Sequence, residues 1–105
     1  MTLLFASLEE AYQQIPLNKT LRMVVAGHIL CVVHTQDGLK AVDDACPHLG
    51  ESLSKGRVNY LNELVCPWHS YRFSLKYGQE VQGKYCKDLK FYKIVFVDNQ
   101  VFVEI

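Results

Sequence analysis

The sequence has no excess charge of either sign and no long apolar run, and each absence excludes a class of protein. Eleven Lys and Arg residues balance eleven Asp and Glu residues over 105 positions, so the formal net charge is zero. Nucleic-acid binders and polybasic membrane anchors need a basic excess, so we expect neither activity. No stretch approaches the roughly 18 apolar residues of a membrane-spanning helix, so we expect no membrane partner.

The amino-terminal segment also lacks the features of a secretory signal. Its apolar run, residues 3–6, is short, and no Lys or Arg precedes it. We therefore expect a cytoplasmic protein whose four cysteines stay reduced and serve as metal ligands or core residues. A mass of 12.1 kDa with half of the residues hydrophobic predicts one domain over residues 1–105.

The order of apolar and polar residues predicts an all-β protein with one short N-terminal helix. Ser7 and Glu10 fit a capping box, which starts a helix that continues to residue 14 and is stopped by Pro16. Alternating and β-branched residues predict strands over 20–33 and 39–42 and a hairpin over 91–105. Such strands form an antiparallel sandwich or small barrel, into which a loop-rich subdomain of about residues 44–83 is inserted.

Two short boxes, CPHLG and CPWH, carry the candidate chemistry. The first contains Cys46 and His48, the second contains Cys66 and His69, and each includes a proline. Two such loops, brought tip to tip, would offer two thiolates and two imidazoles. Thiolate is the ligand of iron–sulfur clusters, and imidazole suits iron or zinc. The residues alone leave tetrahedral zinc open beside a two-iron cluster, although one Cys and one His in each box favour the cluster.

The segments CPHLG and CPWHSYRF resemble the ligand boxes of Rieske ferredoxins and of the Rieske domains of ring-hydroxylating oxygenases. The resemblance covers about 40 residues and implies the family's fold of stacked antiparallel sheets with one [2Fe-2S] cluster per chain. It implies that Cys46 and Cys66 bind the inner iron. It also implies that His48 and His69 bind the outer, solvent-facing iron. It assigns no catalytic residue.

Five positions differ from the high-potential Rieske proteins of cytochrome complexes. Those proteins carry an extra cysteine in each box, forming a disulfide, whereas this chain has Glu51 and Trp68. They also place Ser and Tyr hydrogen-bond donors where this chain has Tyr71 and Phe73. Fewer donors predict a reduction potential in the lower part of the range of roughly −150 to +300 mV. Ser70 replaces the usual Gly, which predicts either mild backbone strain or a hydroxyl near the cluster.

The resemblance implies a one-electron carrier between a reductase and an oxygenase or similar terminal enzyme. The chain ends about where a free-standing Rieske ferredoxin ends, so we expect an electron-transfer protein without catalytic activity of its own. Two alternatives stay open. One is a small Rieske-like subunit of a nitrite reductase, and the other is a zinc-stabilised interaction module.

The other Cys, His, Lys and apolar residues are assigned structural roles. We expect Cys31 to be a buried small hydrophobe, Cys86 to be buried or half-buried, and His28 and His34 to be solvated. Three residues of the boxes are expected to shield the cluster from water: Leu49, Pro67 and Trp68. Four lysines give the tail a basic bias that either faces solvent or docks an acidic partner: Lys84, Lys87, Lys90 and Lys93.

Overall fold

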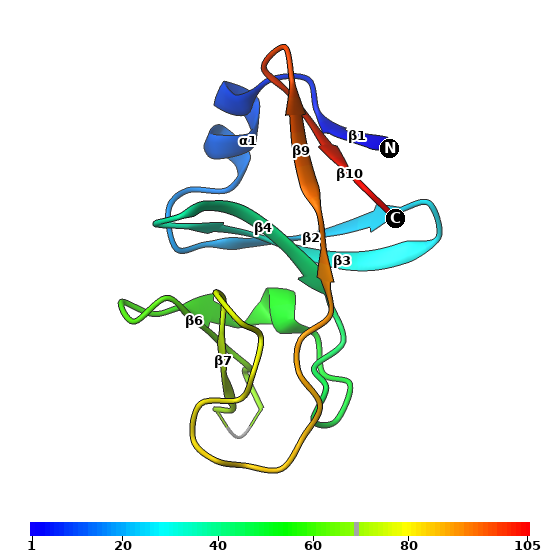
Figure 1. Ribbon diagram of the computed structural model, residues 1–105. Helices are drawn as coiled ribbons and strands as arrows, with labels where there is room; N and C mark the ends of the chain where they lie inside the picture. Colours follow the sequence, from blue (N-terminus) through cyan, green and yellow to red (C-terminus); the bar gives the residue numbers. More distant parts are fainter. Residues whose placement is uncertain (69) are drawn as a thin grey trace.

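The computed structural model describes residues 1–68 and 70–105, which form three antiparallel sheets lying one above another (Figure 1). The upper sheet has the strand order β1-β10-β9, the central sheet β2-β3-β4-β8 and the lower sheet β5-β6-β7. The strands are β1 (Thr2–Phe5), β2 (Thr20–Val25), β3 (His28–Thr35), β4 (Gly38–Asp43), β5 (Arg57–Val58), β6 (Glu63–Val65), β7 (Arg72–Ser74), β8 (Phe91–Tyr92), β9 (Ile94–Val97) and β10 (Gln100–Val103). The helices are α1 (Leu8–Gln14) and the short 3-10 helix η1 (Leu53–Lys55).

Helix α1 begins and ends where the capping signals predict. The Ser7 hydroxyl accepts a hydrogen bond of 3.1 Å from the backbone N–H of Glu10, and the helix ends before Pro16. Strand β1, which precedes the helix, was not expected from the sequence. It pairs with β10 and so joins the two ends of the chain in one sheet.

Strand β3 is buried on both faces and separates two hydrophobic cores. Leu30 and Val32 point into the upper core, whereas Cys31 and Val33 point into the lower core. All four side chains are fully buried, which explains the continuous apolar run at these positions. Because successive side chains of a strand alternate between faces, one strand supports both layers. The predicted ligands Cys46 and Cys66 belong to the lower core.

The expectation of a single hairpin over 91–105 is wrong, because its first part does not pair with its second. Strand β8 pairs with β4 in the central sheet, and the chain crosses at Lys93 to the upper sheet, where β9 and β10 form the hairpin. The Tyr92 hydroxyl donates a hydrogen bond of 2.8 Å to the carboxylate of Asp43. This bond and the burial of the Tyr92 ring favour the edge of β4 over continuation of the hairpin.

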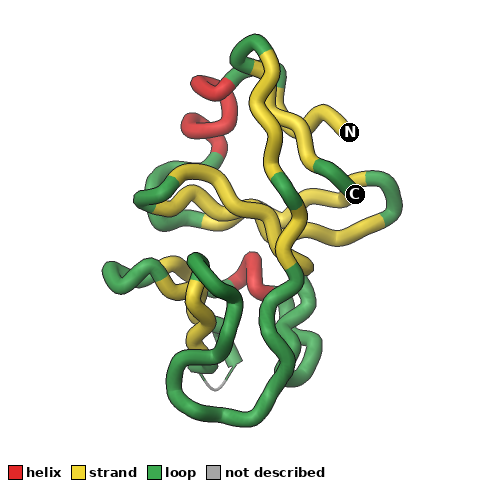
Figure 2. The backbone as a smooth tube through the Cα atoms, viewed as in Figure 1, coloured by secondary structure: helices red, strands yellow, loops and turns green. Residues whose placement is uncertain are grey.

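The all-β prediction with one short N-terminal helix is confirmed, and the described strands do not close into a barrel. The lower part of the molecule is mostly loop (Figure 2), and both CP boxes lie in it. Its strands β5, β6 and β7 are two or three residues long. This short sheet holds the second box at one end.

Candidate metal centre

The first loop, residues 45–52, joins β4 to η1 and is closed by a short antiparallel bridge between Ala45 and Ser52. Within it, the N–H of Cys46 donates to the carbonyl of Glu51 at 2.7 Å, and the N–H of Gly50 donates to the carbonyl of Cys46 at 2.8 Å. Gly50 has φ of 79°, a left-handed conformation that glycine adopts without strain. The loop therefore folds back tightly and turns the Cys46 thiol inward, where the residue is 2% exposed.

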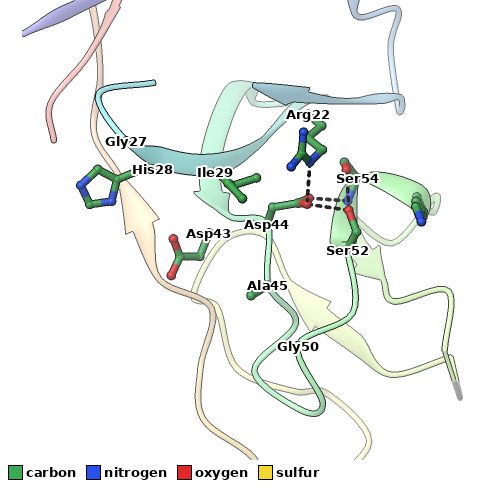
Figure 3. Close-up of a pocket in the computed structure, with 11 residues that line it drawn as sticks. Arg22, Gly27, His28, Ile29, Asp43, Asp44, Ala45, Gly50, Ser52 and Ser54 are labelled. Carbon is green, nitrogen blue, oxygen red and sulfur yellow. Dashed lines mark hydrogen bonds and ion pairs between the residues drawn. The ribbon is translucent and has the colours of Figure 1, made fainter. Parts of the chain in front are cut away.

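Asp44 fastens the two ends of the first loop, as Figure 3 shows. Its carboxylate accepts a hydrogen bond of 2.5 Å from the Ser52 hydroxyl and one of 2.8 Å from the backbone N–H of Ser54. Its carbonyl accepts another from Leu53 at 2.7 Å, and Arg22 approaches the carboxylate at 3.7 Å. Asp44 is 5% exposed, whereas its partners Ser52 and Ser54 are partly buried and Arg22 is half exposed. Sequence analysis did not identify it, because an Asp two residues before a Cys has no distinctive signature.

The second loop, residues 66–71, joins β6 to β7 and is closed by a hydrogen bond of 2.7 Å from the N–H of Cys66 to the carbonyl of Tyr71. Ser70 has φ of 52°, so the residue that replaces the usual Gly adopts the left-handed conformation. The strain expected at Ser70 is therefore present. The predicted ligand His69 lies outside the described residues.

The thiols of Cys46 and Cys66 lie next to each other although they come from separate loops. A side-chain hydrogen bond joins them, and they form no disulfide. The pKa of the Cys66 thiol is raised to about 11, chiefly by burial; a hydrogen bond from the Trp68 backbone lowers it, and the neighbouring Cys46 raises it. Two thiols held together in the lower core would lose their protons on binding a metal, which then stabilises the thiolates.

His48 contacts the second loop through Tyr71. The two rings are stacked, with centroids 3.6 Å apart and planes inclined by 10°. The ammonium of Lys84 lies over the Tyr71 ring, 4.1 Å from its centroid. An imidazole of the first box and an aromatic ring of the second loop therefore link the loops directly.

The donors that the structure brings together fit an iron–sulfur group. Within residues 1–68 and 70–105, no group of three or more His, Cys, Asp and Glu side chains is arranged to hold a metal. What is present is a pair of adjacent thiols in the lower core, with His48 on the same loop as Cys46. A thiolate pair is the ligation that iron–sulfur chemistry requires.

The other two cysteines lie at or near the lower core, and apolar residues of both boxes are exposed. Cys31 is fully buried, and Cys86 is partly buried against the lower core, as expected. Leu49 and Trp68 are 63% and 52% exposed, and the expected shielding of the cluster by Leu49, Pro67 and Trp68 stays a prediction.

The two remaining histidines behave differently from each other. His28 is exposed, as expected. His34 is half-buried. It stacks on Tyr12 at 4.2 Å and contacts the carbonyl of Ile15 at 2.8 Å through Nδ1. Its role is structural, because it joins β3 to the end of α1.

Across the described residues, no helix is both long and apolar enough to cross a bilayer.

Comparison with protein families gives a match over most of the chain. The family described as the Rieske [2Fe-2S] domain matches residues 8–93, which include all four predicted ligands. A cholesterol 7-desaturase of Bombyx mori is 35% identical over 63 residues, which are 59% of this chain and 14% of that protein. The chain therefore spans about a seventh of the length of this relative. The ferredoxin subunit of the 3-phenylpropionate/cinnamic acid dioxygenase of Photorhabdus laumondii is 28% identical over 76 residues, 72% of each chain.

Solved structures share the fold over nearly the whole chain. The ferredoxin of carbazole 1,9a-dioxygenase from Nocardioides aromaticivorans superposes with a TM-score of 0.80 at 23% identity, covering 98% of this chain and 97% of that one. A protein described as the small subunit of a putative NADPH nitrite reductase superposes with a TM-score of 0.78 at 23% identity, covering 100% and 97%. At this level of identity, the superpositions establish the fold.

Proposed function

The chain belongs to the Rieske [2Fe-2S] domain family, and on this premise we propose that it carries single electrons from a reductase to an oxygenase or similar terminal enzyme. The observation that carries the proposal is the pair of adjacent, buried thiols that Cys46 and Cys66 present from separate loops. We propose that residues 1–105 form one domain, with its cluster-binding subdomain at about 44–83. We also propose that the protein is cytoplasmic.

Each side chain of the site has a distinct part in the proposal. Cys46 and Cys66 hold the inner iron as thiolates, in a core that excludes water from their sulfurs. His48 and His69 hold the outer iron as imidazoles. The bound [2Fe-2S] cluster supplies the chemistry by accepting and releasing one electron. Two ferric ions, two sulfides and two thiolates sum to zero charge, so electron uptake is easier than with four thiolates.

The proposed partners follow from the relatives and from the exposed loops. The Photorhabdus laumondii relative is named as the ferredoxin subunit of a dioxygenase, and the match covers 72% of both chains. Leu49 and Trp68, one on each loop, are exposed apolar side chains beside the proposed ligands. Apolar contact around a protruding site suits a transient complex with a reductase and then with an oxygenase.

A second function is favoured by one observation, the superposition on the small subunit of a putative nitrite reductase over essentially both chains. In that case the chain is a fixed component of a larger reductase, and electrons pass through it without its dissociation. Copurification with a large siroheme-containing chain supports this second function. A monomer that exchanges freely with a reductase supports the first.

The test of the cluster begins with the purified chain. We expect a red-brown protein with two iron and two sulfide per chain and an electron paramagnetic resonance signal that appears only on reduction. A colourless protein with one zinc per chain would instead establish the interaction module and reject electron transfer.

The ligand assignment is tested by substituting histidines one at a time. His48→Cys and His69→Cys each place a thiolate on the outer iron, so the visible spectrum shifts and the potential falls. His28→Cys is the control, because His28 is an exposed histidine at the start of β3 and is not a proposed ligand. An unchanged spectrum in either ligand variant refutes the assignment of that residue.

A further inference from the structure

Tyr71 lies between the imidazole of His48 and the ammonium of Lys84, so three side chains form one stack beside the proposed cluster. The Tyr71 and His48 rings lie 3.6 Å apart and nearly parallel, and the Lys84 ammonium lies 4.1 Å from the centroid of Tyr71. These distances place a positive charge about one ring beyond a proposed iron ligand. The high-potential proteins carry a Ser hydrogen-bond donor at this position, where this chain has the larger ring of Tyr71.

Hydrogen bonds of the surrounding backbone fix the position of Lys84. One carboxylate oxygen of Glu80 accepts hydrogen bonds from the N–H groups of Gln82 at 2.9 Å and of Lys84 at 2.7 Å. A further bond of 2.9 Å from Val81 to the carbonyl of Arg72 ties the same turn to β7. The turn over residues 80–84 is thus fastened to the strand that follows the second loop. Lys84 is partly buried there.

Two other cation–aromatic pairs in this chain are looser. Lys76 lies 5.3 Å from the ring of Tyr77, and Lys90 lies 5.2 Å from that of Tyr92. Both distances are longer than the 4.1 Å of Lys84 and Tyr71. Because Lys84 is partly buried, its ammonium is attracted to the ring face more strongly than a fully exposed one would be.

We propose that Tyr71 and Lys84 are positioning residues for electron transfer. Tyr71 holds the His48 imidazole in one orientation, and Lys84 keeps a positive charge that raises the reduction potential. This proposal rests on the proposed function, because it concerns the outer iron that His48 would bind. Reduction adds one electron without making or breaking a bond, so a nearby fixed cation stabilises the reduced form more than the oxidised form.

The decisive variant is Lys84→Gln, with Lys84→Arg as the conservative rescue and Lys76→Gln as the matched control for charge. Lys76 lines a separate cavity with residues such as Lys40 and Phe91, none of which belongs to the ligand loops. In a redox titration with dithionite, we expect Lys84→Gln to lower the equilibrium constant for reduction about three- to tenfold. That change is about 30 to 60 mV for one electron. Lys84→Arg should retain the wild-type potential.

A Lys84→Gln shift no larger than that of Lys76→Gln would overturn the proposal. So would a shift that Lys84→Arg does not reverse. Because salt screens charges near the surface, the difference between Lys84→Gln and wild type should shrink as ionic strength rises from 0.01 to 1 M. A shift independent of salt would point to a structural effect and would also contradict the electrostatic role.

The role of Tyr71 is tested by Tyr71→Phe and Tyr71→Leu. Tyr71→Phe keeps the ring and should leave the potential and the resonance signal of the reduced cluster unchanged. Tyr71→Leu removes the stack, so the resonance signal should broaden. When Lys84→Gln is added to Tyr71→Leu, the further shift in potential should be less than half of the shift that Lys84→Gln causes in wild type. A full shift in that background would show that Tyr71 does not position Lys84.

Failure of this proposal is distinguishable from failure of the proposed function. If the wild-type chain binds no iron and sulfide, electron transfer itself is rejected. If every variant holds a reducible cluster with the same potential, the electron carrier stands and the roles of Tyr71 and Lys84 are rejected.

Discussion

Removal of the Asp44 carboxylate should loosen the first ligand loop while leaving the strands intact. In Asp44→Ala, the N–H of Ser54 loses the carboxylate as its acceptor, whereas the Ser52 hydroxyl keeps a contact of 2.8 Å with the Ser54 hydroxyl. Hydrogen bonds to a charged group contribute about 1.5–3 kcal/mol each, and an unsatisfied buried donor costs about 1–3 kcal/mol. The ion pair with Arg22 adds less than about 1 kcal/mol, because Arg22 is half exposed.

Water limits the loss, because Asp44, Ser52 and Ser54 line an open cavity of about 750 Å³. A water molecule there can replace one hydrogen bond of the lost carboxylate. We therefore expect Asp44→Ala to lower the free energy of unfolding by about 2 kcal/mol, near the bottom of the range for breaking such a network. For a domain of this size, that is a fall in melting temperature of roughly 8–16 °C. Asp44→Asn keeps one acceptor and should lose about half as much.

The assay follows thermal unfolding by circular dichroism and, separately, loss of visible absorption at 25 °C. Asp44→Ala should lose its colour faster than wild type, because the two ends of the loop that carries Cys46 are no longer fastened together. Glu104→Ala, which removes an exposed carboxylate at the end of the chain, is the control. A stability of Asp44→Ala within about 0.5 kcal/mol of that control would refute the reasoning.

Three further predictions concern the strained Ser70, two glycines and the dependence of stability on pH. Ser70→Gly should stabilise the chain by about 1 kcal/mol, measured by thermal unfolding, because φ of 52° is strained for Ser. Gly56→Ala should prevent folded protein from accumulating on expression, because the new Cβ would lie 1.9 Å from the Val65 carbonyl oxygen. Gly83→Ala is the control: its Cβ would meet open space, so the left-handed backbone alone should lower the free energy of unfolding by about 1–2 kcal/mol. Burial holds the pKa of the Cys31 thiol far above its usual range. The buried thiol therefore contributes its full stabilisation at neutral pH. That stabilisation is lost as the pH rises above about 8.5, because the thiol of the unfolded chain then ionises while the folded one stays protonated. Stability should then fall by up to about 1.4 kcal/mol per pH unit more steeply in wild type than in Cys31→Val, as urea titrations between pH 8 and 10.5 would show.

Local signals in the sequence predicted much of the fold. The capping box at Ser7 placed α1, alternation placed β2 and a β-branched run placed β3, because each signal acts within a few residues. The exchange of sheets at Lys93 could not be predicted in this way. It depends on the edge of β4 and on the bond between Tyr92 and Asp43, which are 49 residues apart.

The sequence predicted those parts of the site that have a local signal and missed those that depend on contacts between distant residues. The two boxes identified Cys46 and Cys66, and the structure places their thiols together. The fastening of the first loop by Asp44 and the stack on Tyr71 depend on side chains that meet only after folding. Lys84 was considered only as one of four basic residues of the tail, because nothing in the sequence distinguishes it from Lys87 or Lys90. Its contact with Tyr71 depends on the turn that Glu80 closes.

The two ligand loops differ from disulfide-braced Rieske loops in what holds them to each other. Each loop is closed on itself, the first by Asp44 and Ser52 and the second by the bond from Cys66 to Tyr71. Among the described residues, the stack of His48 on Tyr71 is one contact between the loops besides the thiol pair. A stacked aromatic pair contributes about 0.5–1.5 kcal/mol, against about 2–4 kcal/mol for a disulfide. Metal ligation must therefore supply more of the force that keeps these loops together, so loss of the metal group should separate them more readily than in a braced protein.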